Sequence, residues 1–303
     1  MSEDAPDDLH IVGQHRRRRR AHSCSITLLS PRVNDLVISL RFVDPIDVRP
    51  LSARSVLASA LLGSDRGSLS VAELVAVASL FGISPGAART CLWRMASAGE
   101  LTAGDGTYTL AGRLSERRER VDEAARFDDA VTRRWDGTWE LAIVALERRP
   151  AAERLELRKA AAALHLAELR EGVWIRPDNL DPQRFPACRA VLDRQCTHFH
   201  GAATDIGADR VRSLFSLTAW ADGAGALVDS MNAALTAADR EDSAESFTHD
   251  FALSIAVVRH LQLDPVLPPE FTGDRWPGPA LRATYRRFDR AFKQRMNAAF
   301  RRP

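Results

Sequence analysis

The segment SLFGISPGAARTCLWRMASAGEL, Ser79 to Leu101, constrains the fold more than any other, because one helix ends and another begins inside it. Gly82 predicts the end of the first helix, since glycine accepts the left-handed backbone that often follows a helix. Ser84 predicts the N-cap of the second helix, with Pro85 at the first helical position, where its missing N–H costs nothing. A helix, a short glycine turn and a second helix form the helix-turn-helix arrangement.

The residues on either side extend this arrangement. Two further helices are predicted upstream, at about residues 53–62 and 71–81, each preceded by a serine that can act as an N-cap. Downstream, ELTAGDGTYTLAG predicts two short strands around residues 104–106, which form a hairpin or wing. Together these elements predict a winged helix-turn-helix DNA-binding domain over residues 51–111.

The helix that begins after Ser84 and runs to about Ala98 has two chemically different sides. Ala88, Leu92 and Met95 recur at i, i+4 and i+7 and predict its buried stripe. The opposite side combines small residues with arginines, which lets a helix lie deep in the major groove and reach phosphates and base edges. The residues expected to contact DNA are Arg54, Ser84, Ala87, Arg89, Thr90, Trp93, Arg94 and Ser97. A winged helix used for protein contacts is the alternative, because the fold does not fix the function.

The rest of the chain divides by composition, and we expect an α+β protein. Residues 1–50 are expected to be a disordered N-terminal extension with five consecutive arginines at 16–20. A phosphate-binding arm, a solvated tail and a gene start placed too far upstream are all open interpretations of it. Residues 112–134 predict a charged linker helix. Strand and helix patterns over 135–212 predict a ferredoxin-like domain, and residues 213–303 predict a helical C-terminal domain.

Composition and cysteine use indicate a cytoplasmic protein. The net charge of +2 is close to neutral, so the charge of the whole chain favours no particular partner. The four cysteines form no CxxC pair, which suits a reducing compartment. No apolar run reaches the roughly 18 residues of a membrane span, and the N-terminus has no apolar signal core. We therefore expect neither membrane insertion nor export.

Three sequence patterns in a fixed order carry a family resemblance that extends from about Leu51 to the C-terminus. The first is LSARSVLASALLG with FGISPGAARTCLWRMASAGEL, the second is WDGTWELAIVAL followed by GVWIRP, and the third is DPVLPPEF with DRWPGPALR. With these patterns, the chain resembles the PaaX family of bacterial transcriptional regulators, named for phenylacetic acid degradation. The second pattern resembles the family's central domain, whose fold is related to the Cas2 nuclease.

The resemblance implies a dimeric repressor that binds a double-stranded DNA operator and is released by an aryl-CoA thioester such as phenylacetyl-CoA. By position, Arg89, Thr90 and Arg94 fall where the family keeps its recognition-helix residues. Arg259 and Trp276 fall on its C-terminal pattern. The resemblance implies no cofactor.

Two departures from the family pattern affect these expectations. Family wings are usually longer and rich in arginine, whereas this hairpin has Asp105 and no basic residue between Leu101 and Leu110, so weaker phosphate contacts are expected. Family members often carry a His-Glu pair before the Asp-Pro motif, where this chain has Ile255 and Ala256. If that pair serves effector binding, the effector here differs from phenylacetyl-CoA.

An effector pocket is expected between the central and C-terminal domains. Tryptophans there could hold an aromatic acyl group, and arginines could pair with CoA phosphates. The candidate residues are Trp139, Trp174, Arg176, Arg259, His260, Arg275 and Trp276. The alternative is that the tryptophans fill the core and that the arginines form a solvated surface or salt bridges.

Metal binding and catalysis are weaker interpretations. In CTHFH, Cys196, His198 and His200 face one side of a strand, but neighbours stand roughly 6–7 Å apart, too far for one tetrahedral ion without other ligands. A metal-dependent nucleic-acid-cleaving enzyme on the Cas2-like domain is the alternative function. Such cleavage needs grouped carboxylates, and Glu140 is the only acid in TWELAIVAL. We therefore expect no catalytic residues and no bound metal.

Overall fold

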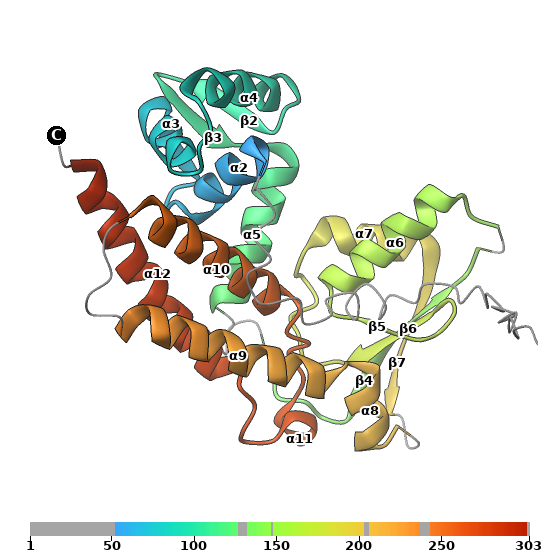
Figure 1. Ribbon diagram of the computed structural model, residues 1–303. Helices are drawn as coiled ribbons and strands as arrows, with labels where there is room; N and C mark the ends of the chain where they lie inside the picture. The colour runs from blue at the N-terminus through green and yellow to red at the C-terminus, as the bar shows by residue number, and fades with distance from the viewer. Residues whose placement is uncertain (1–51, 127–131, 147, 203–205, 237–242, 302–303) are drawn as a thin grey trace, which may run out of the picture.

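The structure is a computed structural model that describes residues 52–126, 132–146, 148–202, 206–236 and 243–301. The predicted N-terminal extension lies outside these ranges. Three parts follow one another along the chain: an N-terminal domain, a central domain around a four-stranded sheet, and a group of C-terminal helices (Figure 1).

The N-terminal domain combines three helices with a three-stranded antiparallel sheet. Its elements are α2 (Ala53–Gly63), β1 (Ser68–Ser70), α3 (Val71–Leu80), α4 (Pro85–Ser97), β2 (Leu101–Gly104) and β3 (Thr107–Leu110). The sheet has the order β1-β3-β2, in which β2 and β3 form the predicted hairpin. This element order is the one expected for a winged helix-turn-helix, although the sequence did not predict the three-residue strand β1.

The predicted helix beginnings in this domain are confirmed. Ser52, Ser70 and Ser84 are N-caps whose hydroxyl groups accept hydrogen bonds from the backbone N–H three residues later. Ser70 also takes part in a capping box. In the hairpin turn, Asp105 and Gly106 have φ values of 46° and 72°, as a type I′ turn requires.

The predicted linker helix is α5 (Gly112–Arg126), which begins in the N-terminal domain and reaches the C-terminal helices (Figure 1). Leu114 packs in the core of the N-terminal domain, whereas Ala124 packs in the core of the C-terminal helices. The helix was expected to reach residue 134, but residues 127–131 lie outside the described residues, and Thr132 forms an isolated β-bridge with Leu180 instead of continuing the helix. This helix is therefore a shared structural element of two cores.

The central domain has the predicted ferredoxin-like α+β fold. Its elements are β4 (Thr138–Val144), α6 (Ala151–Ala163), β5 (Ala167–Arg170), β6 (Val173–Pro177), α7 (Pro186–Gln195) and β7 (Cys196–Ala202). The sheet order is β5-β6-β4-β7 with antiparallel neighbours, and α6 and α7 cover one face. The sequence did not predict β5, which begins at Ala167, shortly after α6 ends. His165 adopts a left-handed backbone with φ of 57° just after α6 ends, a conformation that non-glycine residues rarely adopt.

The C-terminal part is helical, as predicted. Its elements are α8 (Ala208–Leu214), α9 (Leu217–Thr236), α10 (Ala244–Gln262), α11 (Pro269–Thr272) and α12 (Gly278–Arg301). Helix α9 begins at Leu217, and Leu217 and Trp220 already belong to its buried side. No helix in the described ranges is long and apolar enough to cross a membrane.

The N-terminal domain packs directly against the C-terminal helices through an apolar interface. Val56 of α2 and Val77 of α3 lie in one buried cluster with Phe251 of α10 and Phe292 of α12. The ring of Phe81 meets the ring of Phe251 edge-on, with centroids 5.0 Å apart. This packing fixes the orientation of α4 relative to the C-terminal helices.

Two glycines of α9 provide a matched test of the packing between α9 and α10. A Cβ on Gly223 would lie 2.7 Å from Cε1 of His260, whose ring stacks on Trp220, whereas nothing lies within 4 Å of a Cβ on Gly225. Gly223→Ala is expected to lower the free energy of unfolding by about 1–3 kcal/mol through overpacking. Gly225→Ala is expected to raise it by about 0.5–1 kcal/mol, because alanine favours a helix interior. Chemical denaturation measures both values, and equal effects would contradict the tight contact at Gly223.

Candidate nucleic-acid interface

Helix α4 presents an exposed side at the outer end of the N-terminal domain (Figure 1). The predicted stripe of Ala88, Leu92 and Met95 is buried, with exposed fractions of 0%, 0% and 2%. The opposite side is exposed from the N-cap to the last turn. The predicted contact residues on this helix are all exposed: Ser84, Ala87, Arg89, Thr90, Trp93, Arg94 and Ser97.

The exposed side of α4 combines positive charge with one large apolar ring. Arg89 and Arg94 form no ion pair with any described residue, so both guanidinium groups are available to a ligand. Trp93 is 65% exposed, which is unusual for a tryptophan in a folded domain. The helix sequence PGAARTCLWRMAS contains no acidic residue. Its chemistry therefore suits a polyanion.

Arg54, the predicted contact residue on α2, lies in a different electrostatic setting. It donates two hydrogen bonds to the carboxylate of Glu100, at 3.1 and 2.5 Å. These hydrogen bonds are the main cause that raises the pKa of the Arg54 guanidinium above its usual value. Glu100 neutralises the charge of Arg54, so a phosphate would have to compete with this carboxylate.

Cys91 lies on the flank of α4, partly buried against the core of the N-terminal domain. Burial raises the pKa of its thiol above the ordinary value. A thiol with a raised pKa is protonated at neutral pH and is a poor nucleophile. This environment agrees with a small core residue rather than a redox switch.

The predicted effector residues do not converge on one pocket. Trp139 and Trp174 lie on opposite faces of the central sheet, because side chains alternate along each strand. Trp139 packs against Trp135 and Phe271, with ring centroids 5.9 and 5.6 Å apart. Trp174 is buried in the core that α6 and α7 cover. Each tryptophan therefore belongs to a different apolar core.

Arg176 is buried and its donors are engaged by the protein itself. Nε donates to the carbonyl of Pro177 at 3.0 Å, and Nη1 donates to the carbonyl of Leu164 at 3.1 Å. Nη2 donates to Oδ1 of Asn179 at 2.8 Å and to the carbonyl of Val266 at 3.3 Å. Burial lowers the pKa of this guanidinium to about 9. Arg176 therefore ties the central sheet to the connection after α10 and is not placed to bind a CoA phosphate.

The remaining predicted effector residues divide between a partly buried ring stack and the surface. His260 stacks on Trp220, which stacks on Trp276, with centroid distances of 4.7 and 4.6 Å. Nε1 of Trp220 donates to the carbonyl of His260 at 3.0 Å, and Nε2 of His260 lies 2.9 Å from the carbonyl oxygen of Trp220. Burial lowers the pKa of His260, which favours the neutral ring. Arg259 and Arg275 are exposed, so this set supplies structural contacts rather than a common cavity.

The residues considered for a metal site are not grouped around one point. His198 lies 3.2 Å from Asp193, whereas His200 lies 3.1 Å from Asp178. Cys196 is buried and packs in the core under α6 and α7. In the described ranges, no three His, Cys, Asp or Glu residues are placed to hold a metal ion together.

Glu140, the acid considered for catalysis, is buried inside the central domain with only 2% of its surface exposed. It forms an ion pair with Arg189 of α7, which includes a hydrogen bond of 3.2 Å to Oε2. Metal-assisted hydrolysis needs carboxylates that are open to the ion and to water. A buried carboxylate held by an arginine does not meet this requirement.

A groove that the sequence did not predict lies over the sheet face opposite α6 and α7. Its volume is about 760 Å³, and its lining includes Leu141, Leu169, Arg170, Phe199, Ile206 and Arg210. The alternating apolar residues of the strands were the only sequence pattern that could have indicated an apolar sheet face here. The two arginines could not be assigned to it, because neither β5 nor α8 was predicted.

Comparisons with known families agree with this three-part architecture. A model of PaaX-like proteins matches residues 52–117, a model of the PaaX protein central Cas2-like domain matches residues 132–210, and a model of the PaaX-like protein C-terminal domain matches residues 217–302. These matches follow the order of the three sequence patterns. No curated protein matches the chain.

Among solved structures, a similar one covers most of the chain. It is the uncharacterized protein Rv0674 from Mycobacterium tuberculosis, which is 35% identical in sequence. The match covers 82% of this chain and 98% of that chain, with a TM-score of 0.61. Together with the three domain matches, this similarity shows that the chain belongs to the PaaX-like family of regulators.

Proposed function

We propose that the chain is a transcriptional repressor that binds a double-stranded DNA operator through α4. The observation that carries this proposal is the exposed side of α4, where Arg89 and Arg94 have no ion-pair partner among the described residues. Membership of the PaaX-like family supports a regulatory role. The major groove of B-DNA is about 12 Å wide and admits an α-helix.

The order of side chains along α4 supports direct reading of bases. Small residues in its first turn, Gly86 and Ala87, let the helix approach the floor of the groove. Arginine can donate two hydrogen bonds to guanine O6 and N7, which suits Arg89 and Arg94. Trp93 offers an apolar surface to the methyl group of thymine. The helix therefore carries donors and an apolar contact on one accessible side.

The hairpin is proposed to add few phosphate contacts. Its residues between Leu101 and Leu110 include no lysine or arginine, and Asp105 is at the turn. The arginines at 16–20 could supply this charge, but they lie outside the described residues. Phosphate contacts position a protein on DNA without specifying sequence, so α4 would retain the sequence-reading role.

We further propose a homodimer and a small-molecule effector, an acyl-CoA thioester such as phenylacetyl-CoA. A dimer would place two α4 helices in successive major grooves about 34 Å apart, so its operator would be roughly palindromic. Family membership supports the effector. Ile255, where relatives often have histidine, packs toward the interface with the N-terminal domain, and Ala256 packs in the C-terminal core. If this pair serves effector binding, the preferred thioester is expected to differ from phenylacetyl-CoA.

Fluorescence anisotropy on DNA from upstream of the gene and its neighbours tests this proposal. Tight, salt-sensitive binding to one fragment is expected, together with release by one member of an acyl-CoA panel. Specific binding that no thioester changes would support the DNA role and contradict the acyl-CoA effector. No preference for any fragment over random DNA would overturn the repressor.

We propose that the chain is not a nuclease. The buried ion pair between Glu140 and Arg189 supports this proposal, because it removes the one acid of β4 from solvent. Incubation of labelled DNA and RNA with Mg²⁺ or Mn²⁺ is expected to leave both intact. Cleavage that Glu140→Gln abolishes would instead establish the enzyme.

A further inference from the structure

The sheet face opposite α6 and α7 carries a row of apolar side chains. Leu141 of β4 is paired with Ile175 of β6 on one side and with Phe199 of β7 on the other. Paired residues on neighbouring strands point to the same face, with Cβ atoms about 4.5–5.5 Å apart. Phe199 is 52% exposed, so the row ends in an aromatic ring that is half open to solvent.

A bulge in β5 directs a positive charge toward the same face. Glu168 is paired with Trp174 and Arg170 is paired with Val173, so Leu169 is one extra residue between the two pairs. In a regular strand, Arg170 would share the helix-covered face with Glu168, because side chains alternate. With the bulge, Leu169 and Arg170 both line the groove.

Helix α8, which contacts β5, adds a second positive charge to the groove. Ile206 precedes α8 and Arg210 belongs to it, and both residues line the groove. The volume of about 760 Å³ falls in the range of roughly 300–1,000 Å³ that is usual for small-molecule sites. The groove therefore combines an apolar floor with two arginines from neighbouring elements, β5 and α8.

The charges of the groove are not balanced by the lining residues that the structure describes. No aspartate or glutamate is among the described lining residues, and neither Arg170 nor Arg210 has an ion-pair partner in the described part of the chain. The other titratable group of the lining is His200, whose Nδ1 lies 3.1 Å from Oδ2 of Asp178. The groove thus combines an apolar surface with two guanidinium groups that can bind an anion.

We infer that this groove binds an organic anion with an aromatic or aliphatic body. The row from Leu141 to Phe199 contacts the body, and Arg170 and Arg210 pair with phosphate, sulfonate or carboxylate oxygens. Binding rests on the groove alone. The further claim, that this anion is the effector that changes DNA affinity, rests on the proposed function.

A second copy of this chain is a less suitable occupant. In a two-fold symmetric contact, the same surface meets itself. Two stacked grooves would bring the arginines of both copies into one interface, without a carboxylate among the described lining residues. Like charges opposed across an interface are destabilising, so charge complementarity favours the anion.

The dye 8-anilinonaphthalene-1-sulfonate tests the inference, because it joins an aromatic body to one sulfonate. Titration of the full chain is expected to give a saturable rise in dye fluorescence. Phe199→Ala, and separately the double variant Arg170→Ala with Arg210→Ala, should each weaken dye binding roughly fivefold or more. All three side chains are exposed, so the variants should fold normally.

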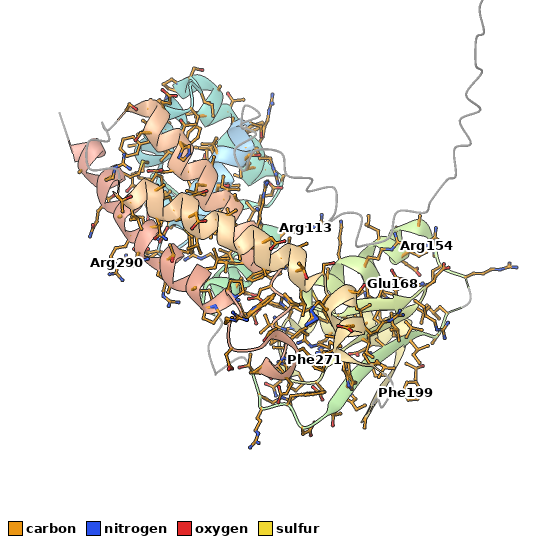
Figure 2. The ribbon with its side chains drawn as sticks, turned by 60° about the horizontal axis from the view of Figure 1, so that its bottom comes forward. Arg113, Arg154, Glu168, Phe199, Phe271 and Arg290 are labelled. Carbon is orange, nitrogen blue, oxygen red and sulfur yellow. The ribbon has the colours of Figure 1, made fainter. Side chains whose placement is uncertain are left out.

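Two matched controls replace exposed residues of the same types elsewhere. Leu155 of α6 is 51% exposed and lies on the helix-covered side of the sheet. Arg290 is exposed on α12, far from Phe199 (Figure 2). Leu155→Ala and Arg290→Ala are expected to leave dye affinity within roughly twofold of the wild type.

Unchanged dye affinity in the groove variants would overturn the site. A second result would also overturn the site: Phe199→Ala converts a dimer to a monomer in light scattering, while the arginine variant binds the dye normally. That result would assign the face to a second copy of the chain. DNA binding is measured on the same preparations. If the groove variants weaken dye binding but the chain shows no DNA preference, the site is supported and the proposed function is overturned. If the chain binds DNA specifically but the groove variants bind the dye normally, the proposed function is supported and the site is overturned.

Discussion

The Arg282→Ala variant is expected to lose about 3–5 kcal/mol of its free energy of unfolding, because removing one partner of a buried ion pair leaves the other charge uncompensated. Nη2 of Arg282 donates to Oδ2 of Asp264 at 2.6 Å, and the two side chains are only 7% and 2% exposed. Nε of Arg282 also donates to the carbonyl of Ala124 at 3.0 Å. One side chain thus connects α12 to α5 and to the turn after α10. Urea denaturation followed by circular dichroism measures the loss.

An exposed ion pair supplies the control for this prediction. Arg194 and Glu156 form a pair at 3.3 Å with side chains 59% and 49% exposed. Arg194→Ala should change the free energy of unfolding by about 1 kcal/mol or less, because solvent screens such pairs. If Arg282→Ala cost no more than Arg194→Ala, the buried pair would not stabilise the fold as the structure indicates.

The Arg94→Ala variant is expected to weaken operator binding by about 1–3 kcal/mol, roughly 5- to 150-fold, if its guanidinium contacts a base. Arg94 is exposed on α4 and has no ion-pair partner among the described residues, so its loss removes a free donor group without a change in the core. Anisotropy on the operator and on its single-base-pair variants measures the effect. Relaxed preference at one base pair would identify a base contact, and uniform weakening would identify a phosphate contact.

An arginine on the central domain serves as the matched control for DNA binding. Arg154 is exposed on α6, which lies apart from α4 (Figures 1 and 2). Arg154→Ala should therefore leave operator affinity unchanged. Wild-type affinity in both variants would remove Arg94 from the recognition surface.

The C-terminal sequence pattern has a structural explanation. Asp264 of DPVLPPEF and Arg282 of DRWPGPALR are the two partners of the buried ion pair. Gly278 lies beside them, since a Cβ there would approach Oδ2 of Asp264 to 2.8 Å. Trp276 stacks on Trp220 of α9. These residues hold the beginning of α12 in place. The contacts of the pattern therefore stabilise the fold.

Much of the N-terminal domain could be predicted from the sequence because its signals are local. Ser52, Ser70 and Ser84 cap helices through hydrogen bonds to groups three residues away. The buried side of α4 follows from a spacing that spans two turns of one helix. The exposed side of α4 could therefore be proposed as a DNA-contacting surface without knowledge of any neighbouring element.

The environments of the residues proposed for an effector could not be predicted in this way, because they depend on distant parts of the chain. Arg176 is satisfied by carbonyl groups of Leu164 and Val266, which are 12 and 90 residues away. Sequence alone cannot separate such an arginine from one that faces a ligand. The groove with Arg170 and Arg210 was missed for a related reason, because a bulge in an unpredicted strand and a short helix place those side chains.

By itself, the sequence determined the local elements, the order of the three parts and the chemistry of the exposed side of α4. Helix caps, glycine turns and apolar stripes depend on residues that are close in the sequence, so the local sequence is enough to specify them. Only the tertiary structure decided that Trp139 and Trp174 face different cores, that Glu140 is closed off by Arg189, and that an apolar groove remains open. Which face of a sheet is covered depends on elements that fold back from elsewhere in the chain, and their packing is a long-range property.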